Sequence, residues 1–193
     1  MKKTLFGLSM TASLVLFSGG AQAQASPMVF LKKTQGKLNK LVQAKASNAK
    51  LKRAVNKLLD FALMSQRTLK KHWTTLDAAK RAEFQKAFQS LLEKKYIKGL
   101  RKKADYKVVY KKQSRSGSMA KVSTEVNYVR KGRPRSNEIV YRLRRVGARW
   151  VIFDVITDDV SMERNYRRSF NRIIKKKGFA ELVKKLKKKA ARM

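Results

Sequence analysis

The spacing of the apolar residues changes twice along this chain, and these two changes limit the possible folds more than any other feature. Up to about residue 100, apolar residues recur at steps of three and four, which is the period of one helix face. Between residues 106 and 152 they follow the alternation of strands, and after residue 159 the helical period returns. This order predicts an α+β domain in which helices cover one face of a twisted sheet.

Five helices follow from the helical spacing. The first two carry their apolar stripes on residues 30–42 and 51–62, and the third, over residues 77–100, has the widest stripe. The last two lie on either side of Gly178, because glycine commonly stands just beyond the end of a helix. We therefore expect about five or more helices in the folded domain.

Four strands follow from the alternating spacing, over residues 106–110, 122–128, 139–143 and 150–152. The segments between them contain glycine, serine or proline, the residues that form tight turns. Consecutive strands are therefore expected to pair as an antiparallel meander. The residues that alternate with the apolar set are mostly polar, which predicts one buried face and one largely wet face.

The first segment has the three parts of a secretory signal peptide. Two lysines precede an apolar run over residues 5–17, and small residues follow up to Ala25. This run is too short to cross a hydrocarbon layer about 30 Å thick, so cleavage after Ala23 or Ala25 is favoured over a membrane anchor. We predict a signal peptide over residues 1–25, a single domain over residues 26–193, and a periplasmic location.

The charge of the chain predicts an anionic partner. The sequence has 49 Lys and Arg against 12 Asp and Glu, a formal net charge of +37. An exported protein meets phospholipid headgroups and other anionic envelope components far more than nucleic acid, so no nucleic-acid partner is expected. Two interpretations remain open on this evidence: contact with anionic membrane surfaces, and a binding module for anionic envelope polymers.

Nothing in the sequence predicts an enzyme, a metal site or a cofactor. The chain has no cysteine and a single histidine, His72, and it lacks the glycine-rich loops that bind phosphates. The acidic residues Asp154, Asp158, Asp159 and Glu163 lie close together in the sequence, but three of them flank the predicted start of a helix. We interpret this group as structural. An envelope enzyme that acts on lipid remains the weaker alternative.

Two blocks of residues carry a family resemblance. The first comprises Phe61-Ala62-Leu63-Met64, Leu69-Lys70-Lys71-His72-Trp73, Lys80-Arg81-Ala82-Glu83-Phe84, Phe88, Leu91-Leu92, Tyr96 and Leu100. The second comprises Trp150-Val151-Ile152-Phe153-Asp154-Val155, Val160-Ser161-Met162, Tyr166-Arg167, Phe170, Gly178 and Leu182. With the strands between them, these blocks are similar to the MlaC family, the periplasmic phospholipid-binding components of the Mla (toluene-tolerance) lipid transport system. Lys70 and Asp159 stand where the family usually has glycine.

The resemblance implies a soluble, monomeric shuttle in an intermembrane lipid transport system linked to an ABC transporter, which maintains outer-membrane lipid asymmetry. Its partners would be phospholipid and the transport complexes of the outer and inner membranes, and its only ligand would be phospholipid carried as cargo. The acyl chains would lie in an apolar pocket between the helices and the sheet.

The residues expected to line this pocket come from the apolar stripes of the helices and strands. Closed packing is an equally acceptable interpretation for any one of these positions, because the core of an ordinary domain uses the same residue types. The expected lining residues are Phe61, Met64, Phe84, Phe88, Leu92, Tyr96, Val126, Tyr128, Ile139, Tyr141, Leu143, Tyr166 and Phe170.

Overall fold

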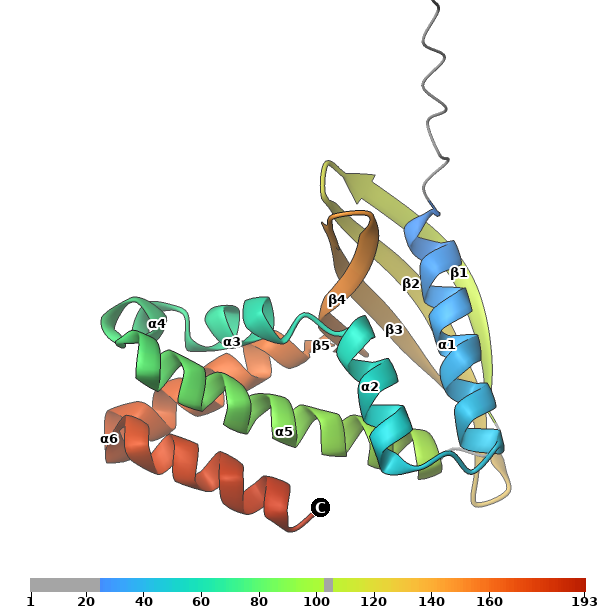
Figure 1. Cartoon of the computed structure of the whole chain (residues 1–193). Coiled ribbons are helices and arrows are strands. Elements are labelled where there is room, and N and C mark those ends of the chain that lie inside the picture. Colours follow the sequence, from blue (N-terminus) through green and yellow to red (C-terminus); the bar gives the residue numbers. More distant parts are fainter. Residues whose placement is uncertain (1–24, 103–105) are drawn as a thin grey trace, which may run out of the picture.

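The structure of this chain is a computed structural model that describes residues 25–102 and 106–193 (Figure 1). The predicted signal peptide lies outside the described residues except for Ala25. Within the described residues, none of the helices has the length and apolar character needed to cross a membrane.

The described residues form an α+β fold with six helices and one antiparallel sheet. The helices are α1 (Pro27–Gln43), α2 (Asn48–Leu58), α3 (Phe61–Leu69), α4 (Lys71–Thr75), α5 (Ala78–Lys102) and α6 (Met162–Ala191). The strands are β1 (Tyr106–Ser116), β2 (Met119–Arg130), β3 (Arg133–Val146), β4 (Arg149–Thr157) and β5 (Val160–Ser161). They lie in sequence order, so the predicted meander is present. The short fifth strand was not predicted, because two residues are too few for an alternating pattern.

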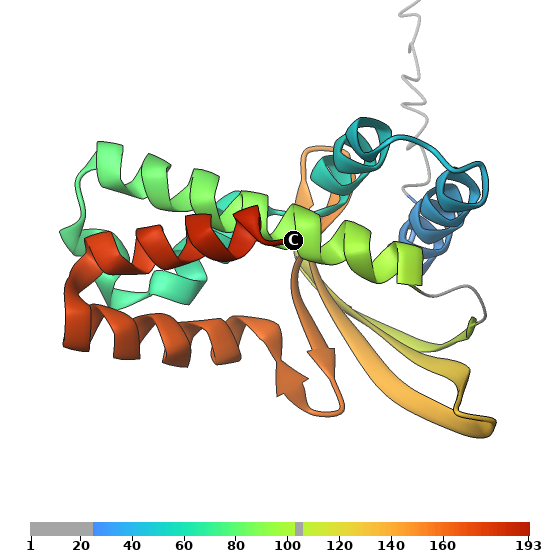
Figure 2. The same cartoon turned by 90° about the horizontal axis from the view of Figure 1, so that it is seen from below.

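The helices form two groups. In Figures 1 and 2, α1, α2 and the C-terminal half of α5 lie over one face of the sheet, whereas α3, α4, α6 and the first half of α5 extend past its edge. The prediction that the helices cover one face of the sheet therefore holds for only part of the helical layer. The remaining helices bury their apolar stripes against one another, which is the other way an amphipathic helix excludes water.

The second predicted helix is broken in two at Leu59. This residue has extended backbone angles and pairs in parallel with Ile152 of β4, and the Asp60 amide donates to the Ile152 carbonyl at 2.8 Å. The Asp60 carboxylate then accepts a hydrogen bond from the Leu63 amide at 3.0 Å and caps α3. The apolar spacing continues across the break, so periodicity alone could not reveal it.

Both faces of β4 are buried, which corrects the expectation of one wet face along the whole sheet. Consecutive residues Trp150, Val151, Ile152, Phe153 and Asp154 are all at most 4% exposed. Helices α2, α3 and α6 all pack against this strand. The face of β4 that was expected to be wet is buried because helices that extend past the edge of the sheet also pack against this strand.

Three of the positions with positive φ bear on the sequence predictions. Gly178 has φ 80° and ψ 170°, and at this point α6 turns back so that its two arms run beside each other (Figure 2). This kink confirms the two C-terminal helices predicted around Gly178. Lys70 and Asp159, where the family resemblance led us to expect glycine, also have positive φ, 48° and 63°, a conformation that favours glycine.

A cluster of aromatic side chains joins α5 to α6. The ring centroid of Phe84 lies 5.6 Å from those of Phe88 and Phe170, and the Phe88 ring lies 5.0 Å from that of Tyr166. The Phe84, Phe88 and Phe170 side chains are at most 3% exposed. Several of these pairs are edge-to-face, the arrangement that aromatic quadrupoles favour. This cluster is the packed centre of the helical group.

Candidate functional site

A cavity of about 410 Å³ lies between the sheet, α1 and the C-terminal half of α5. Its size falls within the range of small-molecule pockets, about 300–1,000 Å³. Most of its lining is apolar, and Lys95 is the one charged residue among the described residues that line it. The lining residues are Gln35, Leu38, Asn39, Leu59, Met64, Leu92, Lys95, Tyr96, Gly99, Leu100, Tyr106, Val108, Val126, Ile139, Tyr141, Val155, Thr157 and Met162.

The lining positions follow the local geometry of each element. On α5 they recur at steps of three and four, from Leu92 to Tyr96 and on to Gly99 and Leu100. On the sheet they are directly paired neighbours that share one face, as Val108 with Val126, Ile139 with Thr157, and Tyr141 with Val155. One helix face and one sheet face therefore oppose each other across a space that their side chains do not fill.

Tyrosine and amide side chains hold α1 against the sheet at one side of the cavity. The Gln35 amide nitrogen donates to the Tyr141 hydroxyl at 2.8 Å, and the Tyr110 hydroxyl donates to the Gln35 amide oxygen. The Tyr106 hydroxyl donates to the Asn39 amide oxygen at 2.9 Å. These bonds satisfy polar groups beside an apolar space, where an unpaired group would be costly. They fix the distance between α1 and the sheet.

Burial changes the acidity of these phenols and makes stability depend on pH. Burial raises the pKa of Tyr110 from 10.0 to about 12, and it also raises the pKa values of Tyr96 and Tyr141. The folded chain therefore retains protons that the unfolded chain releases above about pH 10. The contribution of the protonated phenols to the free energy of unfolding is complete below pH 10 and is lost as the pH rises.

We expect the free energy of unfolding, measured by urea denaturation, to fall as the pH rises from about 10 to about 12. Lysines titrate in the same range, so Tyr110→Phe serves as the control and should show a shallower fall. The tyrosinate absorbance of the folded protein should also lag behind that of the unfolded protein. Identical pH profiles for the two proteins would contradict a contribution from Tyr110.

The structure divides the predicted lining residues into three sets. Met64, Leu92, Tyr96, Val126, Ile139 and Tyr141 line the cavity. Tyr128 lies at an adjoining surface depression near the β2–β3 turn, which shares Tyr106 with the cavity. The remaining side chains lie in the hydrophobic core or pack against it and do not line the cavity: Phe61, Phe84, Phe88, Leu143, Tyr166 and Phe170.

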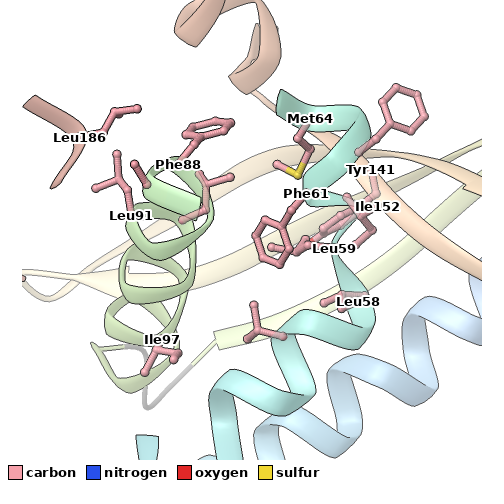
Figure 3. Close-up of a cluster of buried hydrophobic side chains, with 14 of the residues drawn as sticks. Leu58, Leu59, Phe61, Met64, Phe88, Leu91, Ile97, Tyr141, Ile152 and Leu186 are labelled. Atoms are coloured by element: carbon pink, nitrogen blue, oxygen red, sulfur yellow. The ribbon is translucent and has the colours of Figure 1, made fainter. Parts of the chain in front are cut away.

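Figure 3 shows two sides of the same apolar region. Phe88 and Leu91 on α5 lie near Leu186 of α6, while Met64 and Tyr141 lie near Phe61, Leu59 and Ile152. The core and the cavity thus share a boundary and are built from the same residue types. The prediction drew only on apolar stripes, so it did not include polar or glycine lining residues such as Gln35, Asn39 and Gly99. The stripes also do not show which apolar residues, such as Leu100, lack a packing partner.

Two of the clustered acidic residues, Asp154 and Glu163, are buried and have protein partners. The Asp154 carboxylate, fully buried, accepts hydrogen bonds from the Ser161 hydroxyl at 2.8 Å and the Glu163 amide at 2.9 Å. The Glu163 carboxylate pairs with Arg67 at 2.6 Å and Arg167 at 3.1 Å. These bonds connect β4, α3 and α6, as the structural interpretation of this group requires. In the described part of the chain, no three His, Cys, Asp or Glu side chains are placed to hold a metal ion.

The single histidine also has a structural partner. The His72 Nε2 atom lies 2.8 Å from the Asn171 amide oxygen, to which it donates in the corresponding tautomer. This contact joins α4 to α6.

The cavity, with its apolar lining and tyrosine hydrogen bonds, is therefore the candidate functional site.

Comparison with known proteins relates this fold to one family. The family model described as MlaC protein matches residues 25–188. A Haemophilus influenzae protein named intermembrane phospholipid transport system binding protein MlaC is 23% identical over 202 residues, which cover 99% of this chain and 94% of that protein.

A solved structure has the same fold. The phospholipid-binding protein from Ralstonia solanacearum, determined in complex with a phospholipid at 1.53 Å, matches with a TM-score of 0.74 and 20% sequence identity. The match covers 87% of this chain and 98% of that one. Since the family model also spans most of the sequence, this chain belongs to the MlaC family.

Proposed function

We propose that this protein binds phospholipid with its acyl chains in the cavity and carries it between membranes as a soluble periplasmic component of an intermembrane transport system. The observation that carries this proposal is the apolar cavity of about 410 Å³ between α5 and the sheet. The name of the Haemophilus influenzae relative and the phospholipid bound by the Ralstonia solanacearum protein support it.

The hydrophobic effect explains why such a transport step needs a protein. At about 0.8 kcal/mol per CH₂, exposing a sixteen-carbon chain to water would cost roughly 13 kcal/mol. A cavity replaces one apolar environment with another, so transfer from a bilayer is nearly neutral in free energy. Among the lining residues, Met64, Leu92, Val126 and Ile139 supply aliphatic contact, and Tyr96 and Tyr141 supply aromatic contact.

The partners follow from this role. A carrier of this kind receives phospholipid from a complex in one membrane and delivers it to a complex in the other, acting as a monomer that a signal peptide directs to the periplasm. No catalytic step is required, because the lipid leaves chemically unchanged. The basic surface remains available for encounter with anionic membranes and docking partners.

Mass spectrometry of an organic-solvent extract of the purified protein tests the proposal. We expect phospholipid in stoichiometric amount, and we expect it to remain bound through a high-salt wash because buried acyl chains are insensitive to ionic strength. A lipid-free and fully stable protein would contradict the proposal. Binding of an anionic polymer instead, lost steeply with salt, would favour the polymer-binding alternative.

A further inference from the structure

The turn between β2 and β3 is a basic hairpin without acidic residues. Its tip, residues 129–135, contains Arg130, Lys131, Arg133 and Arg135, all exposed, and the sequence has no acidic residue between Glu125 and Glu138. Among the described residues, no ion pair or side-chain hydrogen bond engages these four cations. Their charge is therefore available to a partner.

The turns at the other end of the sheet differ in this respect. Arg144, near the β3–β4 turn, pairs with Asp60, and the Arg145 guanidinium donates to the Gly147 carbonyl at 3.1 Å. Near the β1–β2 turn, the Arg115 guanidinium lies over the Trp150 ring at 5.7 Å. Arg115, Arg144 and Arg145 thus contact other groups of the protein, whereas exposed Arg149 in the same region has no such contact among the described residues, like the four cations of the β2–β3 turn.

The hairpin tip also exposes apolar surface. Val129 is 67% exposed, more than any other large apolar side chain in the described part of the chain, and it pairs directly with the exposed Pro134. Val129 and Pro134 lie on the opposite face of the hairpin from Arg130, Arg133 and Arg135. A bilayer therefore contacts both sets when the tip enters it edge-on, with the long basic side chains reaching the phosphates and the apolar pair at the acyl boundary. An acidic protein surface would match the cations alone.

The hairpin lies at the end of the sheet that forms the cavity. Strand pairing places Tyr128 opposite Arg135 and Arg130 opposite Arg133, on the same face as the cavity-lining residue Val126. Arg130 is four residues beyond Val126, about 13 Å along an extended strand. A bilayer held at the hairpin would therefore lie close to the cavity.

We propose that the β2–β3 hairpin tip docks this protein on bilayers that contain anionic phospholipid, with Arg130, Lys131, Arg133 and Arg135 at the headgroup phosphates and Val129 at the acyl boundary. The proposal builds on the proposed function, since it names the element through which a lipid carrier meets a membrane. It requires no change in the fold, because all of these side chains are already exposed.

Neutralising charges at two different places tests whether docking occurs at the hairpin tip or through the basic surface in general. The triple variant Arg130→Gln/Arg133→Gln/Arg135→Gln is compared with Lys175→Gln/Lys176→Gln/Lys177→Gln, which removes equal charge from an exposed segment of α6 away from the sheet (Figures 1 and 2). Binding is measured by co-sedimentation with vesicles of phosphatidylglycerol mixed with phosphatidylcholine, and with vesicles of phosphatidylcholine alone.

The hairpin variant should bind the anionic vesicles roughly a hundredfold more weakly, since each basic residue near an anionic surface contributes about a fivefold factor. The α6 variant should lose far less, because charges beyond a Debye length from the bilayer are screened. Equal losses in the two variants would overturn the proposal. So would wild-type protein that does not distinguish the two kinds of vesicle.

A fluorescent label tests the orientation. The chain has no cysteine, so Val129→Cys and Val29→Cys each provide a single site for an environment-sensitive dye. Val29 is a matched control at 52% exposure near the start of α1. Anionic vesicles should shift the emission of the label at position 129 to the blue and leave that at position 29 unchanged. Equal responses would overturn the proposal.

Lipid extraction separates this proposal from the proposed function. The hairpin arginines do not line the cavity, so the hairpin variant should retain its phospholipid. Retained phospholipid with unchanged vesicle binding would overturn the docking proposal alone. If vesicle binding depended on the hairpin cations but the purified protein never contained phospholipid, the docking proposal would be supported and the proposed function contradicted.

Discussion

Gly99→Trp is expected to remove most of the bound phospholipid from this protein while leaving it folded. Gly99 lines the cavity from α5, and a β-carbon at this position would meet no atom within 4 Å. Gly99 is itself exposed at the rim of the cavity, so a tryptophan side chain has room to lie across its opening and occupy part of the space that the proposal assigns to acyl chains. Displacing only two methylene groups, at about 0.8 kcal/mol each, corresponds to roughly a tenfold loss of affinity.

Gly36→Trp is the matched control for this experiment. Gly36 is also a helical glycine with open space around its β-carbon position, but it lies on α1 outside the cavity lining. When delipidated protein is loaded at lipid concentrations below Kd, where occupancy follows affinity, the phospholipid found by mass spectrometry of the extract should fall about tenfold or more in Gly99→Trp and stay unchanged in Gly36→Trp. If both variants retained their phospholipid, acyl chains would not occupy this cavity.

Phe84→Ala is expected to cause a large loss of stability. The Phe84 ring is fully buried, 5.6 Å from the rings of Phe88 and Phe170 and 6.4 Å from that of Phe179. Truncation removes these contacts and leaves a void, so we expect the free energy of unfolding in urea to fall by about 3–5 kcal/mol. Phe179→Ala should cost less, since that ring is only partly buried.

The more conservative Phe84→Leu checks whether this cluster is core rather than lining. Because Phe84 does not line the cavity, a folded Phe84→Leu protein should keep its phospholipid despite reduced stability. Loss of phospholipid from a folded Phe84→Leu protein would show that the aromatic cluster and the cavity act as one site. Urea denaturation and lipid extraction on the same preparation distinguish the two outcomes.

Much of the fold could be predicted from the sequence because helices and strands impose different periods. The change to alternation at Tyr106 marks β1, and the glycine at position 178 marks the turn within α6. The break at Leu59 was missed because its apolar side chain is buried in either conformation. The register with Ile152 that requires the break comes from a strand almost a hundred residues later.

The candidate site was only partly predictable, for a related reason. The stripe from Phe84 to Tyr96 on α5 is continuous in the sequence, yet Phe84 and Phe88 pack against α6 whereas Leu92 and Tyr96 face the cavity. The same apolar residue types serve to pack against another helix and to line an apolar cavity. The stripe therefore could not show where packing stops and the cavity begins.

The sequence by itself determined the helix–strand–helix order, the four-stranded antiparallel meander, the excess of positive charge and the family, because each depends on residue type and spacing along the chain. The tertiary structure alone decided which apolar faces touch, which arginines have acidic partners and where the cavity lies. These properties depend on distances between elements remote in the sequence. The hydrogen bonds from Gln35 to Tyr141 and from Tyr110 to Gln35, which hold α1 against the sheet, belong to this second group.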